Sequence, residues 1–383
     1  MSNLRDRLKR INIQKTENKE KLTSSNEKLP ESKEQLASSK RELAIKKENC
    51  YFELVNNGWK NCGFNVLKRV VKTASPFKSI KEFPKVLPIL VPDLQGHEVT
   101  SIADYIFFDL ETTGLSGGAG IVAFLAAFGR IISGKLHITQ YLLLDYSGQY
   151  DFLENIITEF NNNKSFIVTY NGKSFDSQVL NSMCLVNRIK PPLYNHVDLI
   201  HPARRLWKRI INDCSQASIE KNILDVSRKD DIHGSLAPEI WFEFLKTGNT
   251  ERLKGICDHN IYDISGLSRI FAMIISIAKD PLNEIFSYDI EKLALYWRKY
   301  LRKQNENMDI EHLKTQGEEM LKLAADKYCP RAVYVYSYDK MILGNYKEAL
   351  KYVKKGLKLF DEGSDWYSKL LRRKERLDKK INN

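Results

Sequence analysis

The chain has 383 residues, 43% of them hydrophobic, and a formal net charge of +12 at pH 7. This length allows a sizeable core and two or three domains of ordinary size. The amino terminus is charged, and no uncharged apolar run approaches the roughly 18 residues of a membrane span, so we expect a cytoplasmic protein without a secretory signal or membrane segment. The six cysteines form no Cys-x-x-Cys pair, which argues against a zinc knuckle or a dithiol redox site.

Positive charge is concentrated outside the middle of the chain. Counting Lys and Arg against Asp and Glu gives +5 for residues 1–48, +3 for 49–98, −2 for 99–278 and +6 for 279–383. Any grip on a nucleic-acid backbone should therefore come mainly from the basic flanks. The alternative is that the lysine-rich helices simply keep the protein soluble.

Residues 1–48 are rich in Lys, Glu, Ser, Asn and Gln and nearly free of aromatic residues, a composition that cannot bury enough surface to fold alone. A leucine every seven residues suggests a coiled coil, but Pro30 interrupts the repeat of Leu22, Leu29, Leu36 and Leu43. We predict a flexible or partly helical charged arm. Residues 49–98 combine apolar residues at helical spacing (Leu67, Val70, Val71) with four prolines, which predicts a segment that covers the next domain.

Residues 99–278 alternate between strand-like and helix-like patterns. A buried strand begins at Tyr105 and ends in the carboxylates Asp109 and Glu111. It is followed by two strands joined by a Ser-Gly turn, then a helix, a short strand, a second helix and a further strand, at 123–132, 135–145, 151–161, 166–171, 175–187 and 196–200. Three antiparallel strands followed by a crossover helix predict an α/β fold of the RNase H-like type, with a mixed sheet flanked by helices.

Residues 279–383 show only helical patterns, at 284–302, 309–327 and 330–360. The last stretch reads as two helices joined by a Gly-Asn turn. Its spacing of Gly344, Tyr346, Ala349 and Gly356 resembles the second half of a tetratricopeptide repeat. One such unit cannot bury its own apolar face, so we predict a TPR-like stack of helical hairpins, with a protein partner as one possible ligand.

Two carboxylates end the first strand, in the sequence YIFFDLETTGL. Asp109 and Glu111 are two residues apart, so in a strand both side chains point to one face. Two buried carboxylates need a cation nearby, and Mg²⁺ and Mn²⁺ prefer oxygen ligands. The alternative is an ordinary solvated turn after the strand.

Two further acidic positions follow. Asp176, in YNGKSFDSQVL, opens a helix one turn after Asn171 and could equally complement the helix dipole. His259 and Asp263, in CDHNIYD, lie one turn apart on one helix face. The carboxylate could complete a metal cluster and the imidazole could take a proton from water, although such pairs are often surface ion pairs. Tyr262 is a second candidate for that proton.

Together, D109-x-E111, N171-x3-F175-D176 and H259-x3-D263 resemble the DEDD exonucleases of the RNase H-like superfamily, and most of all the YprB-like family. Residues 196–207 and 219–241 are similar to that family too. The resemblance implies a 3′-to-5′ exonuclease that hydrolyses DNA or RNA. Its two divalent ions, Mg²⁺ or Mn²⁺, would be held by Asp109, Glu111, Asp176 and Asp263, and His259 would be the general base. The histidine stands at the spacing that a related motif gives to tyrosine, so the choice of base stays open.

The remaining polar residues have plainer interpretations. Gly117, Gly118 and Gly120 lack the following Gly-Lys-Ser/Thr of a P-loop and predict a permissive turn. Asp198 after a strand predicts a helix cap. Three arginines could contact phosphate or pair with Asp230 and Asp231, namely Arg204, Arg205 and Arg228. The alternative to an enzyme is a non-catalytic RNase H-like module that binds nucleic acid or protein beside a helical scaffold.

Overall fold

The computed structural model describes residues 48–78, 80, 83–97, 101–114, 120–160, 165–283, 285, 287–303 and 310–382. Residues 53–383 form one compact unit. The predicted arm with its leucine repeat lies outside the described residues, as do Gly117 and Gly118. The divisions at 98/99 and 278/279 stay predictions, because they fall inside the compact unit.

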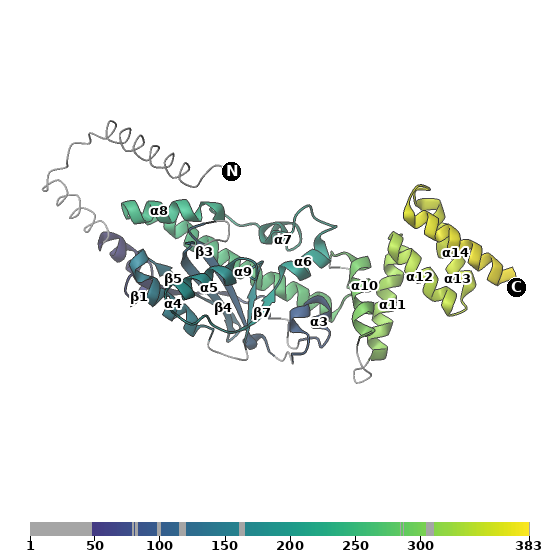
Figure 1. Cartoon of the computed structure of the whole chain (residues 1–383), viewed down its shortest axis with the longest axis horizontal. Helices are drawn as coiled ribbons and strands as arrows, with labels where there is room; N and C mark the ends of the chain where they lie inside the picture. Colours follow the sequence, from purple (N-terminus) through teal and green to yellow (C-terminus); the bar gives the residue numbers. More distant parts are fainter. Residues whose placement is uncertain are drawn as a thin grey trace, which may run out of the picture. The chain divides into compact units, whose positions relative to one another are not determined.

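A mixed sheet of seven strands, ordered β1-β2-β5-β4-β3-β6-β7, is the centre of this unit (Figure 1). Strands β3, β4 and β5 are antiparallel, whereas β6 and β7 run parallel to β3. These five strands are Tyr105–Thr112, Ala123–Ile132, Lys135–Leu143, Phe166–Thr169 and Asn195–Asp198. The arrangement confirms the predicted α/β class, a mixed sheet flanked by helices.

Two further strands, β1 (Lys60–Gly63) and β2 (Val66–Ala74), form a hairpin that extends the sheet beyond β5. The helical spacing expected at residues 67–71 is therefore wrong. Leu67 is fully buried, whereas Val70 is 51% exposed, because only part of this strand lies under other elements. The apolar positions thus lack the simple alternation that would have identified a strand.

Helices pack on both faces of the sheet. The 29-residue helix α9 (Glu251–Lys279) contacts β3, β4 and β5, and a Cβ on Gly129 of β4 would come within 2.5 Å of Ile264 on α9. Phe107 of β3 meets Phe271 of α9, whereas the next residue, Phe108, points to the other face and meets Phe160. The other helices here are α3 (Leu87–Leu90), α4 (Gln149–Thr158), α5 (Asp176–Val186), α6 (Ile200–Trp207), α7 (Gln216–Asn222) and α8 (Ala237–Thr247).

Helix α9 is, among the described residues, the one helix whose length and apolar composition would let it cross a membrane. Within its most apolar window, 67% is buried inside the protein. Core helices of globular domains have the same property, so α9 is accounted for by its packing on the sheet.

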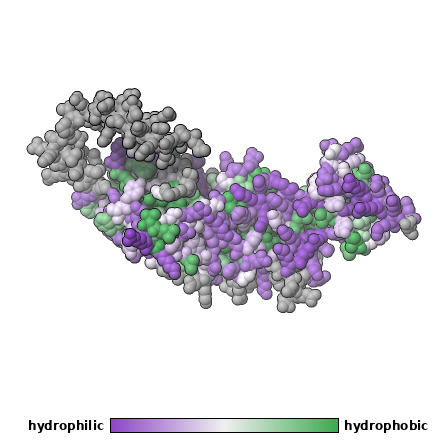
Figure 2. Space-filling model, in the orientation of Figure 1, coloured by the Kyte–Doolittle hydropathy of each residue, from purple (hydrophilic) through white to green (hydrophobic). Residues whose placement is uncertain are grey.

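The chain ends in five helices, α10 (Ile290–Leu301), α11 (Ile310–Asp326), α12 (Pro330–Ile342), α13 (Tyr346–Leu359) and α14 (Asp365–Asn382), shown in green to yellow in Figure 1. Each packs on the next in sequence, and in the view of Figure 2 their surface is mainly hydrophilic. Helix α10 begins later than the predicted residue 284, because the Asp289 side chain caps it by accepting from the amide of Lys292 (3.0 Å). The likeness to a tetratricopeptide repeat stays a prediction.

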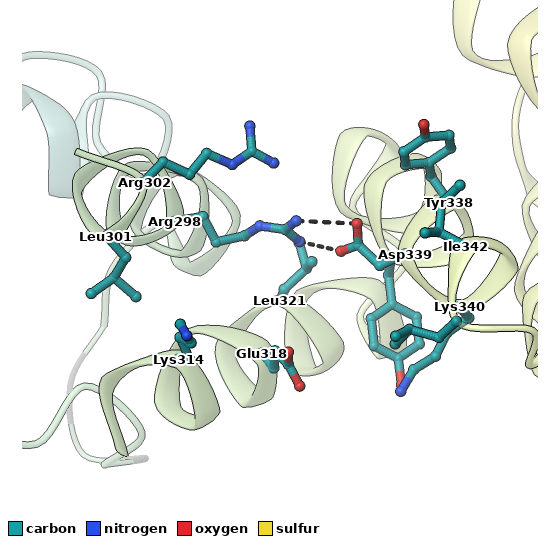
Figure 3. Close-up of a pocket in the computed structure, with 12 residues that line it drawn as sticks. Arg298, Leu301, Arg302, Lys314, Glu318, Leu321, Tyr338, Asp339, Lys340 and Ile342 are labelled. Atoms are coloured by element: carbon teal, nitrogen blue, oxygen red, sulfur yellow. Dashed lines mark hydrogen bonds and ion pairs between the residues drawn. The ribbon is translucent and has the colours of Figure 1, made fainter. Parts of the chain in front are cut away.

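A groove of about 490 Å³ lies between α10, α11 and α12 (Figure 3). Arg298 of α10 crosses it to form a two-pronged ion pair with Asp339 of α12. Arg302 and Lys314 also line the groove, and among the described residues the Arg302 side chain has no ion-pair or hydrogen-bond partner. The groove therefore offers positive charge to an anionic ligand.

Candidate metal and catalytic site

Strand β3 supplies the first two carboxylates at the centre of the sheet. Glu111 is 8% exposed and Asp109 is half-buried. Asp109 shares the face of Phe107, which is the face covered by α9, since these residues are two apart in the strand. The predicted pair thus lies under protein rather than in a solvated turn.

Asp176 is the first residue of α5 and is only 6% exposed. The loop that leads to it is fixed by Asp198, whose carboxylate accepts from the backbone amides of Asn171 (2.7 Å) and Lys173 (3.2 Å). Asn171 has φ of +64°, a left-handed conformation that asparagine tolerates better than most residues. Asp198 also accepts from the amide of Ile200 (3.1 Å), the first residue of α6, although the N-cap position of this helix is Leu199.

Helix α9 contributes the third motif. Oxygen or nitrogen atoms of Glu111, His259 and Asp263 lie within 4.8 Å of one another. His259 Nε2 is 3.2 Å from Asp263 Oδ2, and its Nδ1 is 2.7 Å from Asp231 Oδ1. Tyr262 is 37% exposed and is not a member of this cluster, whereas His259 is. Neither residue lines the neighbouring cavity.

A cavity of about 280 Å³ opens beside these groups. Asp109, Glu111 and Asp176 line it, together with Gly234 at the start of the short helix before α8. A Cβ on Gly234 would stand 2.8 Å from His259 Nε2, so the absence of a side chain makes room for the imidazole. A small substrate group can therefore reach the carboxylates.

The carboxylates repel one another electrostatically. Burial raises the pKa of both Asp109 and Glu111 well above the ordinary range, and the charges of Asp263 and Asp176 raise the pKa of each further. Burial also raises the pKa of Asp176 to about 7, against a lowering by the backbone amides of Asp176 and Leu110. A bound cation would relieve this repulsion.

The contacts of Arg228 with Glu220 and Asp263 are a part of the site that the sequence did not reveal. The Arg228 guanidinium, 10% exposed, contacts Glu220 (2.8 Å), Asp231 (3.2 Å) and Asp263 (2.7 Å). The pairing with Asp231 was one of the two predicted alternatives, and the phosphate contact is not available to a guanidinium so occupied. Arg205 likewise has internal contacts, because it donates to the Leu90 carbonyl (3.1 Å) and lies over the ring of Tyr296.

The donor set fits a hard divalent ion. Three carboxylates from β3 and α5 line one cavity, and Asp263 and the His259 imidazole of α9 lie beside Glu111. Arg228 supplies one positive charge next to Asp263, which is too little to balance four carboxylates. The residues thus fit an oxygen-seeking divalent ion better than a thiol-seeking metal, since no cysteine belongs to the cluster of described residues.

Two sequence comparisons agree with this fold over part of the chain. Residues 106–275 match the model of the RNase H superfamily. Over 181 residues the chain is 36% identical to the uncharacterized protein YprB of Bacillus subtilis (strain 168). The alignment covers 46% of this chain and 43% of YprB, so the chain spans less than half the length of that relative. A family B DNA polymerase from the archaeon Pyrobaculum calidifontis aligns with 74% of this chain and 46% of its own, at 12% identity and a TM-score of 0.36. Residues 106–275 of this chain therefore form a YprB-like domain of the RNase H superfamily.

Proposed function

We propose that this protein is a divalent-metal-dependent nuclease, and specifically a 3′-to-5′ exonuclease that hydrolyses phosphodiester bonds of DNA or RNA by a two-metal mechanism. One observation carries the proposal: Asp109 and Glu111 of β3 and Asp176 of α5 line one cavity, and Asp263 of α9 lies close enough to Glu111 to share a cation with it. Membership of the RNase H superfamily supports the nuclease class. The exonuclease polarity rests on the resemblance of the three motifs to the DEDD enzymes.

The side chains of the site would have different roles in the reaction. The four carboxylates would hold the ions, which when bound would neutralise phosphate charge and acidify a water molecule. His259 would accept the proton of the attacking water at Nε2, while the Asp231 carboxylate fixes the ring through Nδ1 (2.7 Å). Arg228 would hold Asp263 in place through its 2.7 Å contact. Mg²⁺ and Mn²⁺ are the expected ions, and a cytoplasmic location is the expected setting.

The test uses single-stranded DNA and RNA labelled at the 5′ end, with Mg²⁺ or Mn²⁺. A ladder that shortens from the 3′ end is expected for the full chain. The Asp109→Asn/Glu111→Gln double variant, which keeps side-chain size, should lose this activity, and the exposed Asp230→Asn variant should keep it. Equal activity in the wild type and the double variant would refute the assigned site. A wild type that binds these strands without cutting them would favour the non-catalytic binding module instead.

A further inference from the structure

We infer that Asn260 is a positioning residue for Asp109. We further infer that Arg69, on a strand outside the matched residues 106–275, fixes the orientation of the Asp109 carboxylate through the buried amides of Gln140 and Asn260. The inference rests on the proposed metal site, because it concerns how one of its carboxylates is held. Three hydrogen bonds carry it. Arg69 Nε donates to Gln140 Oε1 (2.6 Å), Gln140 Nε2 donates to Asn260 Oδ1 (2.8 Å), and Asn260 Nδ2 donates to Asp109 Oδ2 (2.7 Å).

The sheet register explains why these residues meet. Arg69 on β2 is opposite Gln140 on β5, Gln140 is opposite Ala127 on β4, and Ala127 is opposite Asp109 on β3. Residues directly opposite one another in a sheet point to the same face. The four positions therefore form one row under α9. Ala127 is the smallest of the four, and its methyl group leaves room for the Asn260 side chain to bridge from Gln140 to Asp109.

The chemistry of the two ends fixes the direction of every bond. A guanidinium can only donate, so the Gln140 oxygen must face Arg69. The Gln140 nitrogen then faces the other way, where it also donates to the Cys257 carbonyl (2.8 Å). Asn260 must accept from that nitrogen with its oxygen, which leaves its own NH₂ group for Asp109. The amide orientations, which are otherwise ambiguous, thus follow from Arg69 and Cys257.

The chain is held rigidly. Gln140 and Asn260 are both fully buried, so a flipped amide would leave polar atoms without partners. Arg69 lies with its guanidinium 4.7 Å from the centre of the Trp59 ring and forms an ion pair with Asp258 (3.2 Å). These contacts keep the donor in place at the start of the chain. Asp109 would consequently be oriented before a metal arrives, and the hairpin β1–β2 would contribute to the site without touching it.

The experiment measures Mn²⁺ binding by electron paramagnetic resonance and by calorimetry, with the full chain. Asn260→Leu keeps the side-chain size but removes the donor, and Arg69→Met keeps the reach but leaves Gln140 free to flip. Residues that orient metal ligands typically contribute about 10- to 100-fold in affinity, so we expect that loss for Asn260→Leu and a smaller one for Arg69→Met. Asp258→Asn is the matched control, because its amide oxygen can still accept from Arg69 and hold the guanidinium in place, while the negative charge at this position is lost.

Nuclease kinetics provide a second readout. A positioning role predicts a lower kcat at saturating nucleic acid with little change in KM for the strand, whereas general destabilisation would lower the thermal midpoint and leave metal affinity per folded molecule unchanged. If folded Asn260→Leu and Arg69→Met proteins bind Mn²⁺ with wild-type affinity, this inference is overturned but the proposed metal site is not. Mn²⁺ binding that is unaffected by Asp109→Asn/Glu111→Gln would overturn the proposed site, and the inference with it.

Discussion

The raised pKa of Asp176 makes a quantitative prediction about stability without metal. The shift from the ordinary value of 3.8 to about 7 corresponds to on the order of 4 kcal/mol, because one unit of pKa is about 1.4 kcal/mol. Between these two values the folded state keeps the proton and the unfolded state has lost it. Raising the pH therefore destabilises the metal-free protein across roughly pH 4 to 7, and the full cost is present above pH 7.

Asp176→Asn removes this cost. Its side-chain oxygen can still accept from the backbone amide of Leu110, so the local fold should survive. We expect the metal-free variant to be more stable than the wild type by a few kcal/mol at pH 8, and the difference to shrink to near zero at about pH 4. Urea unfolding at several pH values, with chelator present, measures it. Asp230→Asn, at an exposed position, is the control and should show no such trend.

Metal addition should narrow the difference in stability between the wild type and Asp176→Asn. Mn²⁺ binds the folded wild type and stabilises it by mass action, whereas the variant has lost one ligand and should gain less. At saturating Mn²⁺ and pH 8 the wild type should therefore regain much of its deficit. Two results together would refute the reasoning that burial and repulsion raise the pKa of Asp176. These are equal stability of wild type and Asp176→Asn without metal at pH 8, and equal stabilisation of both by Mn²⁺.

Three further changes test other parts of the structure. Gly234→Ala should displace His259, because the added methyl group would stand 2.8 Å from its Nε2 atom. We expect the cleavage rate to fall by about 10- to 100-fold while Mn²⁺ still binds, and an unchanged rate would contradict the assigned base. Asp198→Ala removes the acceptor of three backbone amides, of which only that of Ile200 is buried, and should cost about 1–3 kcal/mol in urea unfolding. A loss under about 1 kcal/mol would mean that water replaces the carboxylate. Arg302→Glu/Lys314→Glu should weaken the salt dependence of nucleic-acid binding. The slope of the logarithm of the binding constant against the logarithm of the salt concentration should become less steep by about two, and an unchanged slope would favour a protein ligand for the groove.

Much of the candidate site could be predicted because its residues follow the order of the fold. Asp109 and Glu111 end a buried strand, and Asp176 opens the helix after the next parallel strand. The carboxyl ends of neighbouring parallel strands lie at the same edge of a sheet, so these groups were bound to be close. Asp263 required the longer inference from the three motifs together. Its place on α9, the helix that covers this face of the sheet, agrees with that inference.

The parts that the sequence did not reveal depend on long-range pairing. Arg228 meets Asp263 from 35 positions away, in a stretch without regular secondary structure, so no periodicity marks it. Asn260 follows a predicted catalytic residue, yet its function depends on Gln140, which is 120 positions distant. Strand β2 was missed because pairing with β5, rather than an alternating pattern, defines it. Local sequence specifies residue types at these points, but the register that joins them is a property of the sheet.

The C-terminal helices are better tested by substitution than by deletion, because the link between them and the sheet is itself buried. Glu291 at the start of α10 is 4% exposed, accepts from Arg209 (2.7 Å) after α6, and accepts from the amide of Ala332 (2.9 Å) in α12. A chain cut after residue 278 would leave Arg209 without this partner and would uncover apolar surface on α6. Lost nucleic-acid binding by such a fragment would then reflect damage to the sheet domain as readily as loss of the groove. Charge reversal at the groove avoids this, and the same reversal at the exposed Lys351 and Lys354 of α13 separates a specific effect of the groove from a change in net charge alone.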